Sequence, residues 1–209
     1  MINVNYIVII SILILASSSC QQSSNIDTAQ RRVNGKTVEL NLEQLISHEI
    51  STGVRKDTLF LGYRLGMTLG EVQNHTNQLL VLGDLQEEDG KVVAVIIDDI
   101  LNFKAEFGFE YYNGKVYQMN VGFNSEGDIN NSYITTNSLA FMYDEKYGFS
   151  DFSSSSDSYS NYKWVNGNRM IELRSNKLYE AVATYTDLNI LELIEQKKKN
   201  EKERSMQSL

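Results

Sequence analysis

The chain has 209 residues, of which 42% are apolar and 22% are charged, so it can bury a core and is neither a disordered acidic tail nor a multi-span membrane protein. Its net charge of −8 argues against nucleic acid as a partner, because a phosphate backbone would repel it. Two histidines and one cysteine are too few for a zinc site of Cys and His ligands or for a disulfide framework, and we expect no cofactor.

The N-terminus has the pattern of a secretory signal. Residues 6–16 form an apolar run that only Ser11 interrupts, shorter than the roughly 20 residues that a membrane-spanning helix needs. Serines follow at 17–19, and then Cys20, the only cysteine. This arrangement resembles the lipobox of bacterial lipoproteins, which implies that residues 1–19 are a removed signal peptide and that acylated Cys20 anchors the protein to membrane lipid. There are two alternatives. The protein is an ordinary secreted protein with a leftover cysteine, or the apolar run is an uncleaved signal anchor.

Polar segments flank the body of the chain at both ends. Residues 20–36 follow the leader and are mostly polar, so we expect a flexible tether. Residues 195–209 carry five basic and three acidic side chains, which favours a solvated, charged helical tail over a contact with anionic lipid. The rest of the chain holds 14 basic against 24 acidic side chains, so the body itself is acidic.

The first part of the body, residues 37–124, begins with two helix signals. Apolar residues recur at helical spacing behind Asn41, which is a suitable helix cap. Thr68 and Glu71 form a capping box that predicts the start of a second helix. Between these helices, residues 58–65 are rich in β-forming side chains and predict a strand.

Strand signals follow the second helix. Apolar and polar residues alternate over 103–111, which predicts a strand with one buried face. Residues 113–114 are Asn-Gly, the pair that suits a type I′ turn, and the return strand covers 115–123. Asp-Gly at 89–90 before the apolar run 92–97 predicts another hairpin.

The second part, residues 125–194, repeats this plan. Sliding residues 109–123 by 62 positions lays them on 171–185 with the same alternation of apolar residues. We therefore predict an α+β fold of two tandem modules, each with short helices packed on a small antiparallel sheet. The serine-rich residues 151–160 are expected to form a mobile loop. The identities in this alignment are Glu110 with Glu172, Lys115 with Lys177 and Tyr117 with Tyr179.

Residues 66–72 read Gly-Met-Thr-Leu-Gly-Glu-Val. This stretch resembles the helix start of the small outer-membrane lipoproteins of the SmpA/OmlA (BamE-like) group, and the resemblance covers residues 40–124. It implies a short helical pair packed on a three-stranded antiparallel sheet. That family is similar in turn to the paired modules of the β-lactamase inhibitory protein. We do not extend the resemblance to a role in outer-membrane assembly.

No constellation of residues predicts a reaction. His48 and His75 lie in the two predicted helices, and we expect both at the surface rather than in acid–base chemistry. Asp98, Asp99 and Asp128 are the only support for a hydrolase or a metal-dependent enzyme. We accordingly predict no catalytic residue and no metal site.

Aromatic residues near the hairpins are the best candidates for a binding surface. Tyr112, Tyr159, Tyr162 and Trp164 have the chemistry of a protein or sugar contact surface, although core packing and strand propensity also explain such residues. The sequence as a whole predicts a non-catalytic binding or scaffolding lipoprotein of a Gram-negative envelope, lipid-anchored at the periplasmic side of the outer membrane. The rivals are an inhibitor that blocks an envelope hydrolase with a sheet face and its loops, and an enzyme.

Overall fold

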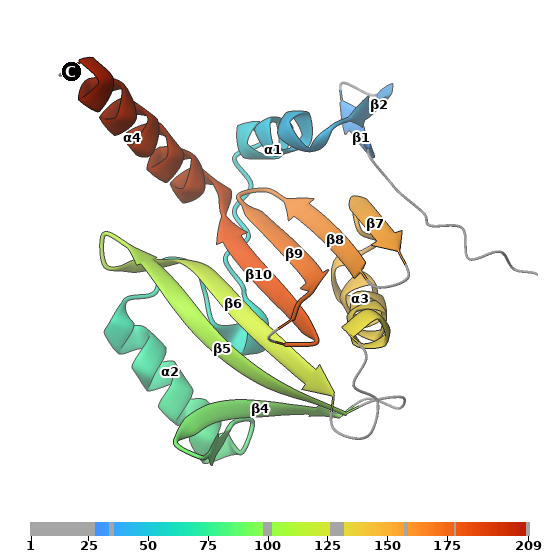
Figure 1. Cartoon of the computed structure of the whole chain (residues 1–209), viewed down its shortest axis with the longest axis vertical. Coiled ribbons are helices and arrows are strands. Elements are labelled where there is room, and N and C mark those ends of the chain that lie inside the picture. The colour runs from blue at the N-terminus through green and yellow to red at the C-terminus, as the bar shows by residue number, and fades with distance from the viewer. Residues whose placement is uncertain are drawn as a thin grey trace, which may run out of the picture.

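The structure is a computed structural model that describes residues 28–33, 36–97, 102–125, 132–156, 159–177 and 179–207. The fold of these residues is α+β, as predicted, with four α-helices, one large antiparallel sheet and a separate two-stranded sheet (Figure 1). In chain order the elements are β1 (Ala29–Val33), β2 (Lys36–Leu40), α1 (Leu42–Ser51), the 3₁₀ turn η2 (Phe60–Gly62), α2 (Leu69–Leu82), β3 (Gln86–Glu88), β4 (Lys91–Ile97), β5 (Asn102–Tyr112), β6 (Lys115–Ser125), α3 (Ser132–Tyr147), β7 (Phe152–Ser156), β8 (Tyr159–Asn166), β9 (Arg169–Ser175), β10 (Ala181–Asp187) and α4 (Leu188–Gln207).

The caps predicted for the first two helices are both present. Asn41 Oδ1 accepts a hydrogen bond from the Gln44 backbone N–H at 2.9 Å, and the Gln44 side chain accepts from the Asn41 N–H at 3.0 Å. Thr68 and Glu71 make the same reciprocal pair at the start of α2, with the Glu71 carboxylate 2.7 Å from the Thr68 backbone nitrogen. Because each box satisfies two otherwise unpaired backbone donors, these residues fix where α1 and α2 begin.

Residues 58–65 do not form the predicted strand. Leu61 and Gly62 have φ angles of 52° and 79°, so the chain turns back at η2. Leu59 and Tyr63, on either side of this turn, are fully buried. The β-forming side chains of this segment therefore serve as core residues of a tight turn, a case in which tertiary packing overrides strand propensity.

The large sheet has the strand order β3-β4-β5-β6-β10-β9-β8-β7, and every neighbouring pair is antiparallel. The predicted hairpins at 89–90 and 113–114 are confirmed, and both residues of each turn have positive φ. The serine-rich segment is not the predicted loop, because residues 152–156 form the edge strand β7. Phe152 begins that strand and is buried, which attaches it to the body of the protein.

A helix followed by four strands occurs twice in the chain. α2 precedes β3 to β6, α3 precedes β7 to β10, and the two sets join where β6 pairs with β10. The 62-residue slide places Val121 on Ala183, and these two residues are also direct partners across the β6–β10 junction. A local two-fold relationship thus passes through this pair, although both halves contribute to a single core. An internal duplication remains a prediction that this arrangement supports.

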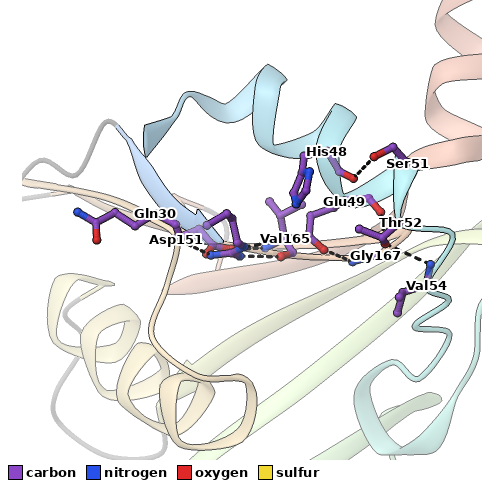
Figure 2. A network of polar contacts seen from close by, with 10 residues as sticks. Gln30, His48, Glu49, Ser51, Thr52, Val54, Asp151, Val165 and Gly167 are labelled. Carbon is purple, nitrogen blue, oxygen red and sulfur yellow. Dashed lines mark hydrogen bonds and ion pairs between the residues drawn. The ribbon is translucent and has the colours of Figure 1, made fainter. Parts of the chain in front are cut away.

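The two faces of the large sheet are covered differently. α2 and α3 pack on one face, where Met119, Val121 and Phe123 of β6 are buried in the main core. On the opposite face, α1 and β1 cover only the end over β7, β8 and β9, through a small cluster that includes Leu45 and Val165. Figure 2 shows α1 and α3 on opposite sides of these strands. The central strands β5, β6 and β10 therefore keep one face against which none of the described helices packs.

Candidate functional site

Several residues singled out in the sequence lie outside the described part of the chain. These are Cys20, Asp98, Asp99 and Asp128. Within the described ranges, no group of three or more His, Cys, Asp or Glu side chains is arranged to hold a metal ion. None of the helices described there is both long and apolar enough to cross a bilayer.

The four aromatic candidates do not form one surface. Tyr159 is 42% exposed and Tyr112 is half-buried, whereas Trp164 is only 4% exposed. The Trp164 indole donates to Asp144 Oδ1 at 3.0 Å and to the Gly148 carbonyl at 2.9 Å. Trp164 is therefore corrected from a surface residue to a core residue, because its place in β8 points it toward α3 rather than toward solvent.

Tyr162 shares this orientation. Its ring stacks on Trp164 with centroids 6.2 Å apart, and its hydroxyl donates to Asn137 Oδ1 of α3 at 2.8 Å. Burial raises the pKa of the Tyr162 hydroxyl. Tyr162 is half-buried and forms a contact between β8 and α3. Of the four candidates, only Tyr112 and Tyr159 remain candidates for a contact surface.

The two histidines are both half-buried rather than at the surface as expected. The His75 ring nitrogen Nε2 lies 2.9 Å from the Leu61 carbonyl oxygen. Its ring also meets Tyr63 edge to face, with centroids 4.6 Å apart. His75 thus ties α2 to the η2 turn, a structural role that the polar neighbours of this residue in the sequence do not indicate.

The uncovered side of β5, β6 and β10 carries a ladder of hydrogen-bonded polar side chains, which we call the open face (Glu110, Gln118, Asn120 and Thr184). Gln118 Nε2 donates to Glu110 Oε1 at 3.0 Å, and Thr184 Oγ1 donates to Asn120 Oδ1 at 3.0 Å. The Tyr117 hydroxyl donates to the second Glu110 oxygen at 2.6 Å, and this bond raises the pKa of Tyr117 to about 12. The bonds hold these side chains in fixed orientations on neighbouring strands.

Charged residues around the open face are paired. Lys91 contacts Glu106 at 3.0 Å, Lys104 contacts Glu88 at 2.5 Å, and Lys163 contacts Glu172 at 3.2 Å. Each of these three lysines has a carboxylate beside it, and the two oxygens of Glu110 accept from Gln118 and Tyr117, so the face presents mainly amide, hydroxyl and hydrogen-bonded carboxylate groups. Such a face is suited to hydrogen bonding with another polar surface rather than to electrostatic attraction of an ion.

Arg31 joins β1 to the large sheet in a polar network (Figure 2). Its guanidinium donates to Glu49 Oε1 at 3.1 Å, to Asp151 Oδ1 at 2.6 Å and to the Val165 carbonyl at 3.2 Å. The other Glu49 oxygen accepts from the Gly167 backbone N–H at 2.9 Å. This network fixes the N-terminal strand and α1 against the β8–β9 hairpin.

Burial raises the pKa of the Asp151 carboxyl group, whereas the Val165 N–H and the Arg31 charge oppose that shift. Burial lowers the pKa of the Arg31 guanidinium, but the carboxylates of Asp151 and Glu49 outweigh this effect, so its pKa is raised. The guanidinium therefore stays charged, and the pairing offsets much of the cost of burying it. No signal in the sequence indicated this network, because Arg31 and Glu49 each lie more than 100 residues from Asp151, Val165 and Gly167.

The chain was compared with protein-family models, with curated proteins and with solved structures. No family model matches it, no curated protein matches it, and no solved structure matches it. The resemblance of residues 66–72 to the SmpA/OmlA group and the likeness to the β-lactamase inhibitory protein therefore stay predictions.

Proposed function

We propose that this protein is an envelope lipoprotein of a Gram-negative bacterium, anchored through acylated Cys20 at the periplasmic side of the outer membrane. In this proposal it binds another envelope protein without catalysing a reaction. The open face is the observation that carries the binding role, because it is a fixed set of polar groups that the helices of the protein leave uncovered.

The proposed anchor and the Arg31 network together define how the body would be held. Ala29, the first residue of β1, lies nine positions after Cys20, and a chain of that length reaches at most roughly 30 Å. Arg31 connects β1 to β8, so the body would stay close to the bilayer instead of moving at the end of a longer flexible tether. A partner would then be met near the membrane surface.

The partner that fits the open face is a folded protein with a polar contact surface. Three lysines beside the face are already bound to carboxylates, and the amide groups of Gln118 and Asn120 can each bond to groups of a second protein. Tyr112 and Tyr117 flank this region and add the amphipathic contact area that is common at protein interfaces.

Two experiments in cells test this proposal. Labelling with an alkyne fatty acid should mark the wild-type protein and leave Cys20→Ala unmarked. A benzophenone amino acid placed at position 110 or 120 should crosslink to one recurring protein, whereas the same group at Gln73 or Asn77, exposed on α2, should not. An unlabelled wild type would overturn the anchor, and equal crosslinking from α2 and the sheet would overturn the open face.

An inhibitor of an envelope hydrolase is the second candidate. The observation in its favour is the sheet built from two similar sets of four strands joined at β6 and β10, the kind of paired module that the predicted likeness to the β-lactamase inhibitory protein implies. If the crosslinked partner is a hydrolase, adding the purified protein should lower its activity. A hydrolase that is bound but fully active would leave the scaffolding role as the better account.

A further inference from the structure

A second region of the protein has a different chemistry from the open face. A pocket of about 360 Å³ lies between the end of α3, the β8–β9 hairpin and the segment that follows α1. It lies within the size range of small-molecule sites. Its lining includes four cationic side chains and three aromatic ones: Arg31, Lys56, Lys146, Arg169, Tyr147, Phe149 and Trp164.

Arg169 is the central feature of this pocket. It is the first residue of β9 and is only 7% exposed, yet no carboxylate in the described part of the chain forms an ion pair with it. One terminal nitrogen donates to the Thr58 carbonyl, and the guanidinium lies 5.1 Å from the centre of the Tyr147 ring. Its Nε is buried without any hydrogen-bond partner among the described residues.

A buried cation without a counter-charge is unusual, because removing a charge from water is costly unless a partner compensates it. Buried polar donors are also almost always paired in folded proteins. Arg169 departs from both rules at once. An anion in the pocket would supply the counter-charge that the Arg169 guanidinium lacks.

The other charges of the pocket act in the same direction. Lys56 and Lys146 form no ion pair with any described carboxylate, and Lys146 lies 5.3 Å from the centre of the Tyr147 ring. Asp151 is the acidic residue of the lining, and its carboxylate already binds Arg31 at 2.6 Å. The pocket therefore has a surplus of positive charge on a protein whose net charge is −8. Such a local reversal of sign attracts anions to one place.

We propose that this pocket binds a small organic anion through a phosphate or carboxylate group that bonds to Arg169. The planar guanidinium fork matches the oxygen geometry of either group, and Lys56 and Lys146 add charge without fixed direction. Tyr147 and Trp164 form an aromatic part of the wall that can contact the rest of the ligand. This site does not depend on the anchor or on the open face.

Trp164 provides a direct way to test the site, because it lines the pocket and is the only tryptophan in the chain. The intact protein is titrated with inorganic phosphate and, separately, with succinate, at constant ionic strength maintained with chloride. We expect a saturable change in Trp164 emission with at least one of these anions and a dissociation constant of about 1 mM or lower. The two titrations distinguish a phosphate site from a carboxylate site.

Two variants connect the signal to the pocket. Arg169→Gln should weaken binding about tenfold or more, because a charged hydrogen bond is lost. Lys56→Gln combined with Lys146→Gln removes two exposed charges from the rim, so it keeps the test valid if Arg169→Gln fails to fold. The matched control is Lys198→Gln combined with Lys199→Gln, two exposed charges on α4 far along the chain from the pocket.

The proposal predicts that the rim variant binds several-fold more weakly and that the α4 control binds as the wild type does. No saturable response to either anion overturns it, since the Arg169 guanidinium would then have no anionic partner in the pocket. An equal loss of affinity in the rim variant and the α4 control also overturns it, because that result indicates general charge screening.

Discussion

Arg31 and Asp151 are 120 positions apart in the chain, and the Arg31 guanidinium donates to Asp151 Oδ1 at 2.6 Å. The second Asp151 oxygen accepts from the Val165 backbone N–H at 2.7 Å. Asp151 thus connects the N-terminal strand to β8 with one carboxylate. Its side chain is 8% exposed, so the loss of Arg31 would leave a largely buried carboxylate without a cation.

We expect Arg31→Met to lower the free energy of unfolding by about 2–3 kcal/mol, since a buried charge loses its partner while the apolar stem is kept. Arg55→Met is the matched control. Arg55 also pairs with aspartates, with Asp57 at 2.8 Å and with Asp187 at 3.7 Å, but its own side chain is 58% exposed and should contribute less than about 1 kcal/mol.

Denaturant unfolding measures both changes, and Asp151→Asn completes the comparison. The double variant Arg31→Met with Asp151→Asn should lose clearly less stability than the sum of the two single variants, because the two residues act as one unit. Strict additivity of the two losses would show that the 2.6 Å contact contributes nothing to stability.

Tyr179 lies across Gly122 on the sheet face opposite α2 and α3. A β-carbon at Gly122 would come within 2.6 Å of the Tyr179 ring, a distance that requires the ring or the strand to move. We expect Gly122→Ala to lower the free energy of unfolding by about 1–3 kcal/mol through overpacking. Tyr179→Ala in the same chain should recover part of that loss.

Gly108→Ala is the control for this variant. Gly108 lies in the neighbouring strand β5, and a β-carbon there would meet nothing within 4 Å. Adding a methyl group at Gly108 should therefore leave stability unchanged or raise it slightly, because glycine weakens a strand. Similar losses at both positions would indicate that strand backbone effects, and not the Tyr179 ring, determine the result.

Tyr117 gives a prediction for the open face. The hydrogen bond to Glu110 is the main cause that raises its pKa to about 12, and burial adds to the shift. The folded state therefore favours the neutral phenol, so this contribution to stability is complete below pH 10.0 and is lost as the pH rises through about 12. In protein with ¹³C-labelled tyrosine, the Tyr117 resonance should titrate near that value.

Glu110→Gln should move the Tyr117 titration toward the ordinary tyrosine pKa of 10.0. Tyr111 is the internal control, since burial alone raises its pKa and it should titrate as before. An unchanged Tyr117 titration in Glu110→Gln would contradict the bond that fixes this part of the open face.

Local signals in the sequence were sufficient for much of the fold. The Thr68 and Glu71 capping box and the Asn113-Gly114 turn each depend on residues within four positions of one another. Both can therefore be predicted without the tertiary structure. The edge strand β7 was missed because serine is a weak strand former. What holds β7 in place is its pairing with β8 and the burial of Phe152, which no local pattern displays.

The sites were less predictable because they depend on register. Trp164 was assigned to a surface, yet it pairs with Ile171 and points into the core. Arg169 lies two positions before Ile171 and four before Leu173, so it occupies the buried phase of β9. A charged residue on the buried face of an alternating strand can be recognised from the sequence alone. Arg169 is such a residue, and it could have indicated the pocket.

The Trp164 indole reports on Asp144, to which it donates at 3.0 Å. Burial raises the pKa of the Asp144 carboxyl group above 3.8, although bonds from Trp164 and from the Ser150 N–H oppose the shift. Because the folded state favours the protonated form, this contribution to stability is complete below pH 3.8 and is lost as the pH rises through the raised pKa. We therefore expect Asp144→Asn to be at least as stable as the wild type at pH 7.

Trp164 emission measures the titration of Asp144 directly. In the wild type, the emission should change with a midpoint above pH 3.8. Glu145→Gln is the control and should show the same change, because the Glu145 side chain is exposed and makes no bond to the indole. The transition should vanish in Asp144→Asn, and its persistence there would assign the emission change to another group.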